Sequence, residues 1–354
     1  MKNLARAELE PGMQVAEDII NYRGDIVFKK GTTLDAVKIA KLARHSIMVV
    51  PIFEKIDFAA SHFERVRLSD GFQKFSEMYN MGFVAYKRAM MDYVMFQTAF
   101  DMDKLYNNIY LKVVETAPSP KDILDYLYNM MPSEDDMTHA HCFNSALIAG
   151  VFADWMGLSE TDRIIFVQTG FVYDIGKLRI PDSILWKTGA LDDSERTLLM
   201  KHARMGYDLL KRLPCNAHIP IAAMQHHERL DGSGYTEGLR GNNIDIFARY
   251  IAIVDTYEAM TSARVYRQSM NPFQVIAAFE SNHGYERYDK DVLRTILTNI
   301  AQNQIGLEVR LSDDTICKVT GINSDALSRP FVKPRGSDEI LDLTMYNMTI
   351  EALC

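Results

Sequence analysis

Histidine is concentrated in one part of the chain. Six of the nine histidines lie between residues 139 and 227, namely His139, His141, His202, His218, His226 and His227. Neutral imidazole is the side chain that binds metals most often, and divalent cations also take carboxylate ligands. The clustering therefore indicates metal chemistry in this segment.

Two acidic residues of the same segment follow apolar sequence. Asp174 comes after the apolar stretches 164–167 and 171–172, and Asp255 comes directly after 250–254. A carboxylate in apolar helical sequence is costly to bury unless it is paired or bound to a cation. Each residue alone is more typical of a hydrogen-bonded core group. Spread over five predicted helices, the histidines and aspartates together favour convergence on one metal site.

Longer motifs surround these residues. They are Tyr-Asp-Ile-Gly-Lys at 173–177 with Ile-Pro-Asp-Ser-Ile-Leu at 180–185, His-His-Glu-Arg-Leu-Asp-Gly-Ser-Gly-Tyr at 226–235, and Thr-Ser-Ala-Arg-Val-Tyr-Arg at 261–267. With these motifs in this order, the segment 135–300 resembles the HD-GYP proteins. The resemblance implies an all-helical hydrolase domain whose two or three metal ions are usually iron or manganese. It also implies cleavage of the bacterial second messenger cyclic di-GMP.

The resemblance assigns roles to individual residues. It places metal ligands at six positions, namely His141, Asp174, His202, His226, His227 and Asp255. Asp174 would be shared between two divalent metal ions, and Lys177 would lie beside the scissile phosphate as the other catalytic residue. The substrate would contact five further residues, namely Asp231, Gly234, Tyr235, Arg264 and Arg267.

The chain departs from the family at the defining His-Asp pair. Tyr173 stands at the histidine position, immediately before Asp174. A neutral phenol is a weak ligand because its ordinary pKa is about 10. Two interpretations stay open: Tyr173 packs or hydrogen-bonds and one ligand is missing, or it binds ferric iron, which favours the ionised form. The first metal site is therefore expected to be weak or empty.

Two smaller departures concern the metal count and the substrate loop. Met137, one turn before His141, stands where relatives with a third metal provide Glu, so two metals are expected. Thr236 replaces the proline of Gly-Tyr-Pro. Proline restricts its own backbone and that of the preceding residue, so its loss loosens the loop without removing a functional group.

Other conspicuous side chains are given structural interpretations. Trp155 and Trp186 are predicted to be packing residues. Glu228 is either an orienting residue beside the histidine pair or an exposed salt-bridging residue. Three histidines match no ligand position of the family and are predicted to be surface or structural residues: His139, His218 and His283.

The elements that must position the site are helices. Periodic apolar residues predict helices at 138–156, 160–176, 192–212, 217–228, 244–262, 271–282 and 288–302. Residues 1–55 are predicted to form a small α/β module, in which Thr33 caps a helix. Residues 56–130 are a helical connecting or sensor region, 131–302 the HD-GYP-like domain and 303–354 a small β extension. The fold class is mainly α, an all-helical HD-type domain with two small flanking parts.

Composition excludes some classes of partner. The 354 residues include 39 Lys and Arg against 47 Asp and Glu, a net charge of −8. Such a chain is a poor binder of nucleic-acid polymers. No apolar run approaches the roughly 18 residues of a membrane span, so no membrane insertion is expected.

Four scattered cysteines fit a reduced, cytoplasmic protein. A homodimer through the Met- and aromatic-rich helices near 75–130 is compatible with the sequence.

Three functions are open at this point. The first is a metal-dependent cyclic di-GMP phosphodiesterase that releases linear dinucleotide or GMP. The second is an inactive receptor that keeps the cleft, which the tyrosine at position 173 motivates. The third is a phosphohydrolase of another nucleotide, because family likeness locates chemistry better than it names a substrate. Cleavage, binding without cleavage, and turnover of a different nucleotide would distinguish them.

Overall fold

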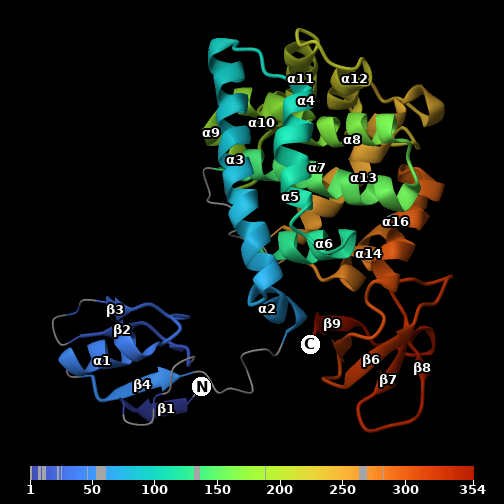
Figure 1. Ribbon diagram of the computed structural model, residues 1–354. Helices are drawn as coiled ribbons and strands as arrows, with labels where there is room; N and C mark the ends of the chain where they lie inside the picture. The colour runs from blue at the N-terminus through green and yellow to red at the C-terminus, as the bar shows by residue number, and fades with distance from the viewer. Residues whose placement is uncertain are drawn as a thin grey trace. The chain divides into compact units, whose positions relative to one another are not determined.

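The chain divides into two compact units, Met1–Arg65 and Val66–Cys354. The computed structural model describes residues 2–6, 9, 13–21, 24, 26–45, 47–52, 61–130, 136–187, 189–262, 269–281 and 283–354. The predicted fold class is confirmed, because a mainly helical body is accompanied by a small N-terminal α/β part and a C-terminal sheet (Figure 1).

The N-terminal unit consists of two short antiparallel strand pairs and one helix. Strand β1 (Lys2–Ala5) pairs with β4 (Val49–Ile52), and β2 (Ile19–Ile20) pairs with β3 (Ile26–Phe28). Helix α1 spans Ala36–Arg44. The core of this unit is apolar and includes Val15, Leu34, Leu42, Val50 and Ile52.

The prediction that Thr33 caps this helix is wrong. Asp35 immediately precedes the helix, and its carboxylate accepts the backbone N–H of Lys38 at 2.7 Å. A cap must adjoin the first helical residue in order to reach these free N–H groups. Thr33 lies two residues too early, and its hydroxyl accepts the Gln14 side-chain amide.

The second unit contains the helical body. Its longer helices are α3 (Asp70–Phe96), α6 (Pro120–Asn129), α7 (Met137–Met156), α8 (Glu160–Val172), α10 (Asp193–Met200), α11 (His202–Leu210), α12 (His218–Gln225), α13 (Ile246–Thr261), α14 (Pro272–Ser281) and α16 (Lys290–Gln302). Its shorter helical segments are α4 (Met102–Lys104), η2 (Leu105–Tyr110), α5 (Leu111–Val114), η4 (Ile175–Arg179), α9 (Asp182–Leu185), η5 (Gly241–Asn243), α15 (Gly284–Arg287) and η6 (Leu343–Met345). Helix α2 (His62–Arg67) crosses the boundary between the units.

Helix α7 is the centre of the body. Nearly every residue from Thr138 to Ala153 is buried, as expected for a helix that is apolar on all sides. Helix α8 packs closely against it at Gly170. A Cβ atom at Gly170 would lie 2.6 Å from the Cα of Ala146 on α7. The two helices therefore approach closely at a position that only glycine permits.

We expect Gly170→Ala to lower the free energy of unfolding by about 1–3 kcal/mol, because an added methyl forces α7 and α8 apart. Thermal unfolding of the full chain measures the effect. Gly189→Ala is the matched control, since a Cβ there meets no atom within 4 Å. Equal melting temperatures for the two variants would contradict the prediction.

Helix α3 is hydrogen-bonded to the rest of the second unit by buried tyrosines. The Tyr86 hydroxyl donates to the carbonyl oxygen of Phe171 at 2.7 Å, and the Tyr93 hydroxyl donates to that of Leu209 at 2.6 Å. Both acceptors lie in helices of the histidine-rich segment, namely α8 and α11. Helix α3, in the first part of the predicted connecting region, thus helps to hold these helices in place.

Two predicted helices are interrupted, and both predictions of a continuous helix are wrong. The stretch 192–212 breaks at Lys201 into α10 and α11, and 160–176 ends its α-helix at Val172 before η4 begins. Close packing explains the second break. A Cβ at Gly176 would lie 1.9 Å from the backbone oxygen of His202. The backbones of η4 and α11 therefore meet, which brings Asp174 next to His202.

The C-terminal part is a five-stranded antiparallel sheet in the order β8-β7-β6-β5-β9. The strands are β5 (Glu308–Leu311), β6 (Ile316–Gly321), β7 (Phe331–Pro334), β8 (Leu341–Asp342) and β9 (Ile350–Leu353). The Asn271 side chain donates to the carbonyl oxygens of Ile350 and Glu351, both at 3.1 Å, and joins β9 to the helical body. In the described part of the chain, no helix is both long and apolar enough to cross a membrane.

Candidate metal centre

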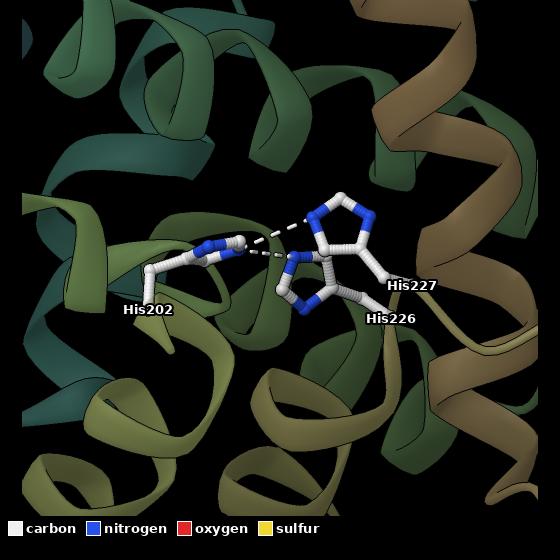
Figure 2. A group of neighbouring side chains, drawn as sticks. All are labelled: His202, His226 and His227. Carbon is white, nitrogen blue, oxygen red and sulfur yellow. Dashed lines mark hydrogen bonds between the residues drawn. The ribbon is translucent and has the colours of Figure 1, made fainter. Parts of the chain in front are cut away.

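Three histidine side chains converge from two places in the fold. His202 is the first residue of α11, and His226 and His227 lie directly after α12. The Nε2 atom of His202 lies 3.3 Å from that of His226 and 3.2 Å from that of His227 (Figure 2). Consecutive residues at the helix end thus present both rings to the same point opposite α11.

The protonation of these rings fits a metal ion. The Nδ1–H of His202 donates to the Leu199 carbonyl oxygen at 2.6 Å, and that of His226 donates to the Ala223 carbonyl oxygen at 2.8 Å. A carbonyl only accepts, so in the neutral rings the lone pair is on Nε2. These lone pairs face one another at hydrogen-bond distance without a proton between them. A cation bound to the Nε2 atoms would remove that conflict, so the residues fit a metal.

Burial keeps the same rings neutral. It lowers the pKa of His202, lowers the pKa of His226 to about 4, and holds that of His227 well below its ordinary value. The positive charge of neighbouring Lys177 acts in the same direction. Neutral imidazole is the form that binds metals, so the site is ready to bind a cation at neutral pH.

Asp174 lies between this histidine group and a second group. Its carboxylate is fully buried, with Oδ1 3.3 Å from His202 Nε2 and Oδ2 3.7 Å from His141 Nε2. Apart from the ion pair with Lys177, neither oxygen has a hydrogen-bond donor among the described residues. Burying a carboxylate with so few hydrogen bonds is costly, and a cation bound between the two groups would compensate its charge.

Lys177 forms an ion pair with Asp174. Its Nζ lies 2.5 Å from Asp174 Oδ2. Burial alone would lower the pKa of Lys177, but the charge of Asp174 outweighs burial and raises that pKa. The same ion pair lowers the pKa of Asp174 against the opposite effect of burial. Both groups are therefore charged at neutral pH, and one side of the ammonium borders the cavity described below.

The second group contains His141, Asp174 and Asp255, and their ligand atoms lie within 4.8 Å of one another. His141 comes from α7 and Asp255 from α13, with 3.0 Å between His141 Nε2 and Asp255 Oδ1. The other ring nitrogen of His141, Nδ1, is hydrogen-bonded to the Glu258 carboxylate. Burial alone would lower the pKa of His141, but Glu258 and Asp255 raise it to about 9.

Within the second group, His141 is already paired with the Asp255 carboxylate and with the neighbouring Glu258 carboxylate. Because the pKa of His141 is raised, its Nε2 carries a proton at neutral pH when no metal is bound. A metal there would have to displace that proton and break the His141–Asp255 contact. The three-histidine group has no such competition. The two halves of the centre therefore differ in their readiness to bind a cation.

Tyr173 is at the junction of the second group. Its hydroxyl lies 2.5 Å from His141 Nε2, 3.1 Å from Asp255 Oδ1 and 3.2 Å from Ser145 Oγ. Burial, followed by the negative charges of Asp255 and Asp174, raises the pKa of Tyr173 well above its ordinary value. With no metal bound, Tyr173 is therefore a neutral hydrogen-bonding group between His141 and Asp255.

Glu258 contacts the candidate ligand His141, and the sequence interpretation did not single it out. Besides His141, it accepts the Asn144 side-chain amide at 3.0 Å and a short hydrogen bond from Ser262. Asn144 in turn accepts the Tyr79 hydroxyl of α3 at 2.7 Å. The signal was available, because Glu258 lies one helical turn after Asp255 in the same apolar helix. Burial of that helix face places both carboxylates beside His141.

The loop after the histidine pair is held by Glu228. This buried carboxylate accepts the backbone N–H groups of Glu237, Gly238 and Leu239 at 2.6, 3.2 and 3.0 Å. The prediction of an exposed salt-bridging residue is wrong, since Glu228 is buried and its carboxylate hydrogen-bonds to the loop backbone. These three hydrogen bonds hold residues 237–239 of the loop against Glu228, where the loop begins.

Replacing Glu228 should therefore release the loop. In Glu228→Ala the three backbone donors lose their acceptor, and we expect amide hydrogen exchange at residues 237–239 to increase at least about tenfold. Glu228→Gln keeps one acceptor oxygen and should give an intermediate rate. Unchanged exchange in the alanine variant would show that this carboxylate does not hold the loop.

The predicted substrate residues of this loop have different surroundings. Tyr235 stacks on the His227 ring, with centroids 4.6 Å apart. A Cβ at Gly234 would lie 2.4 Å from the His227 carbonyl oxygen, so glycine permits this close approach. Asp231 accepts the backbone N–H of Ser233 at 2.8 Å on the exposed side of the loop. Their contact with substrate stays a prediction.

The two predicted phosphate-binding arginines, Arg264 and Arg267, lie outside the described residues. The other histidines have local partners. His218 Nδ1 lies 2.6 Å from Asp245 Oδ2, and the exposed His283 Nδ1 lies 3.2 Å from Glu286 Oε2. His139 is buried near Tyr86. In the described part of the chain none of these three belongs to a group suited to a metal.

A cavity of about 220 Å³ opens beside the centre. Its lining includes the charged or polar residues His141, Lys177 and Glu258 and the apolar residues Leu185, Trp186 and Leu199. It therefore gives a small molecule access to groups that neighbour the candidate ligands. Trp186, which was predicted to be a packing residue, lines this cavity and is 38% exposed.

The HD domain family profile matches residues 125–292. The cyclic di-GMP phosphodiesterase response regulator RpfG of Xanthomonas campestris is 33% identical over 191 residues, which cover 53% of this chain and 50% of that protein. The 3'3'-cGAMP-specific phosphodiesterase 1 of Vibrio cholerae is 35% identical over 174 residues, or 49% of this chain and 40% of that protein. The chain thus spans about half the length, or less, of the curated relatives that it matches.

Solved structures support the fold. The structure of "Bd1817, a HDG"Y"P protein from Bdellovibrio bacteriovorus" superposes with a TM-score of 0.52. It covers 84% of this chain and 98% of the other, at 10% sequence identity. At that identity the likeness concerns the fold alone.

Proposed function

We propose that this chain, whose residues 125–292 match the HD domain family profile, is a metal-dependent phosphodiesterase of cyclic dinucleotides. The single observation that carries the proposal is the convergence of three neutral histidine Nε2 atoms beside the Asp174–Lys177 ion pair. The curated relatives are named as phosphodiesterases of cyclic di-GMP or of 3'3'-cGAMP. Cyclic di-GMP is the first substrate that we propose.

The residues have distinct tasks in this function. His202, His226, His227 and Asp174 would hold a divalent ion, iron or manganese, which supplies a nucleophile at neutral pH and neutralises phosphate charge. The His202 and His226 rings are held in the ligand tautomer by the backbone carbonyls of Leu199 and Ala223. Lys177, on the cavity wall, would stabilise the phosphate charge or donate a proton to the leaving oxygen.

We also propose that the first metal site is weak or empty. The protonated His141, its two carboxylate partners and the Tyr173 hydroxyl satisfy one another without a metal. A second ion would break that network. The centre would then work with fewer ions than the two that the family resemblance implies.

The cytoplasmic location expected from the cysteines stays a prediction.

Product analysis tests the function. The full chain, loaded anaerobically with Fe(II) or Mn(II), is incubated with cyclic di-GMP and separately with 3'3'-cGAMP, and linear dinucleotide and GMP are quantified. Turnover that Asp174→Ala abolishes would support the proposal. No cleavage of either compound by protein shown to carry metal would contradict it.

One observation favours a second candidate, a receptor that binds the dinucleotide without cleaving it. The Tyr173 hydroxyl occupies the place between His141 and Asp255, where the family has a metal-binding histidine. In addition, the hydrogen-bonded series Tyr79, Asn144 and Glu258 connects α3 with His141. Binding of intact cyclic di-GMP by equilibrium dialysis, with no product formed, would favour this candidate.

A further inference from the structure

The cavity beside the metal centre is lined by two chemically different sets of residues. His141, Lys177 and Glu258 are the charged set, and Lys177 Nζ is 2.5 Å from the Asp174 carboxylate. Leu185, Trp186 and Leu199 are the apolar set. A ligand that fits both sets has an anionic group and a flat apolar group close together. A nucleotide, with its phosphate and base, has this composition.

Trp186 is the side chain of the apolar set that is suited to a base. It follows α9 directly, and its backbone N–H donates to the Asp182 carbonyl oxygen at 2.9 Å, which fixes the start of the side chain. It is nevertheless 38% exposed, so part of its indole ring has no protein cover. The other tryptophan, Trp155, is half-buried and stacks on Phe152 with centroids 5.6 Å apart. Stacking on a neighbouring ring gives Trp155 a structural role, whereas the exposure of Trp186 points to a different role.

The placement of Trp186 relative to the charged groups matters for the proposed reaction. Both Trp186 and Lys177 line one cavity of about 220 Å³, so a phosphate at Lys177 leaves its attached nucleoside near the indole. Aromatic side chains bind bases by stacking, and every base has a face that can stack. An exposed aromatic residue in the same cavity as a phosphate-binding cation is therefore suited to bind the base.

We propose that Trp186 is the stacking platform for one purine base of the cyclic dinucleotide, a role that rests on the proposed function. The apolar neighbours Leu185 and Leu199 exclude water from the edges of the stacked base. Since stacking does not read hydrogen-bond donors and acceptors, Trp186 contributes equally to guanine and adenine. It sets affinity for cyclic dinucleotides as a class and does not choose between cyclic di-GMP and 3'3'-cGAMP.

The test compares Trp186→Ala and Trp186→Phe with Trp155→Phe in the metal-loaded full chain. We expect Trp186→Ala to raise KM for cyclic di-GMP about 5- to 150-fold, the loss typical of one stacked base. Trp186→Phe keeps a ring and should recover most of the affinity. KM for 3'3'-cGAMP should rise by a similar factor. Inhibition by inorganic phosphate, which reaches only the charged set, should be unchanged.

Fluorescence gives an independent measurement, because the chain has only two tryptophans. Cyclic di-GMP should quench the emission of the wild type and of Trp155→Phe, but not that of Trp186→Phe. If the wild type cleaves cyclic di-GMP and Trp186→Ala leaves KM and quenching unchanged, the stacking proposal is wrong and the function stands. If the wild type neither binds nor cleaves a cyclic dinucleotide, both proposals are wrong.

Discussion

Asp174→Asn is expected to lower cyclic di-GMP hydrolysis on the order of 10³-fold or more. That exceeds the loss of a single charge-stabilising donor, which is about 10²–10³-fold, because this carboxylate serves three neighbours. It lies 3.3 Å from His202 Nε2, 3.7 Å from His141 Nε2 and 2.5 Å from Lys177 Nζ. The neutral amide removes the ligand charge and leaves the Lys177 ammonium without its partner.

Metal content and turnover are measured together on the same preparations. Asp208→Asn is the matched control, because Asp208 makes the same kind of ion pair with Lys211 on the surface of α11. It should keep both metal and activity. Thermal unfolding shows whether Asp174→Asn still folds. A folded Asp174→Asn protein with full metal content and undiminished turnover would remove Asp174 from the centre.

Tyr173→His should have the second large effect, an increase in bound metal from about one to about two ions per chain. The imidazole would restore a ligand between His141 and Asp255, where the wild type has a neutral hydroxyl 2.5 Å and 3.1 Å from their ligand atoms. A second ion would also displace the proton of His141. We therefore expect hydrolysis to increase along with the metal content.

Metal analysis and visible absorption distinguish the two interpretations of Tyr173. Tyr173→Phe is the control, since it removes the hydroxyl without adding a ligand and should leave the metal content at about one. Wild-type protein that already holds two ions would contradict the prediction. A visible absorption band of the ferric wild-type protein that is lost in Tyr173→Phe would instead identify a phenolate ligand.

Much of the fold could be predicted from periodicity alone. The predicted helices at 138–156, 244–262 and 288–302 correspond closely to α7, α13 and α16, because each carries a long apolar pattern. The continuous helix 192–212 could not be excluded in this way. Nor could the end of the α-helix at Val172, within the predicted helix 160–176, be predicted, because it depends on the close contact of Gly176 with the His202 backbone, and no local pattern reports such a contact.

The candidate site shows the same division. Asp255 was found because it is a carboxylate in apolar helical sequence, and Glu258 was missed although it has the same property one turn later. Glu228 was misinterpreted because its three backbone partners lie nine to eleven residues further along the chain. Trp186 was predicted to be a packing residue, and only the structure shows that it lines a cavity.

The sequence by itself determined which chemical groups are available and which of them lie together locally. Asp174 and Lys177 are one turn apart, and His226 and His227 are adjacent at a helix end, so their proximity follows from backbone geometry. The tertiary structure alone decided how the two groups of ligands differ. The bonds of His141 with Tyr173 and with Glu258 join residues 32 and 117 positions apart, and they form only because α7, α8 and α13 pack together. That packing leaves three neutral histidines ready for a cation and holds a proton on the fourth.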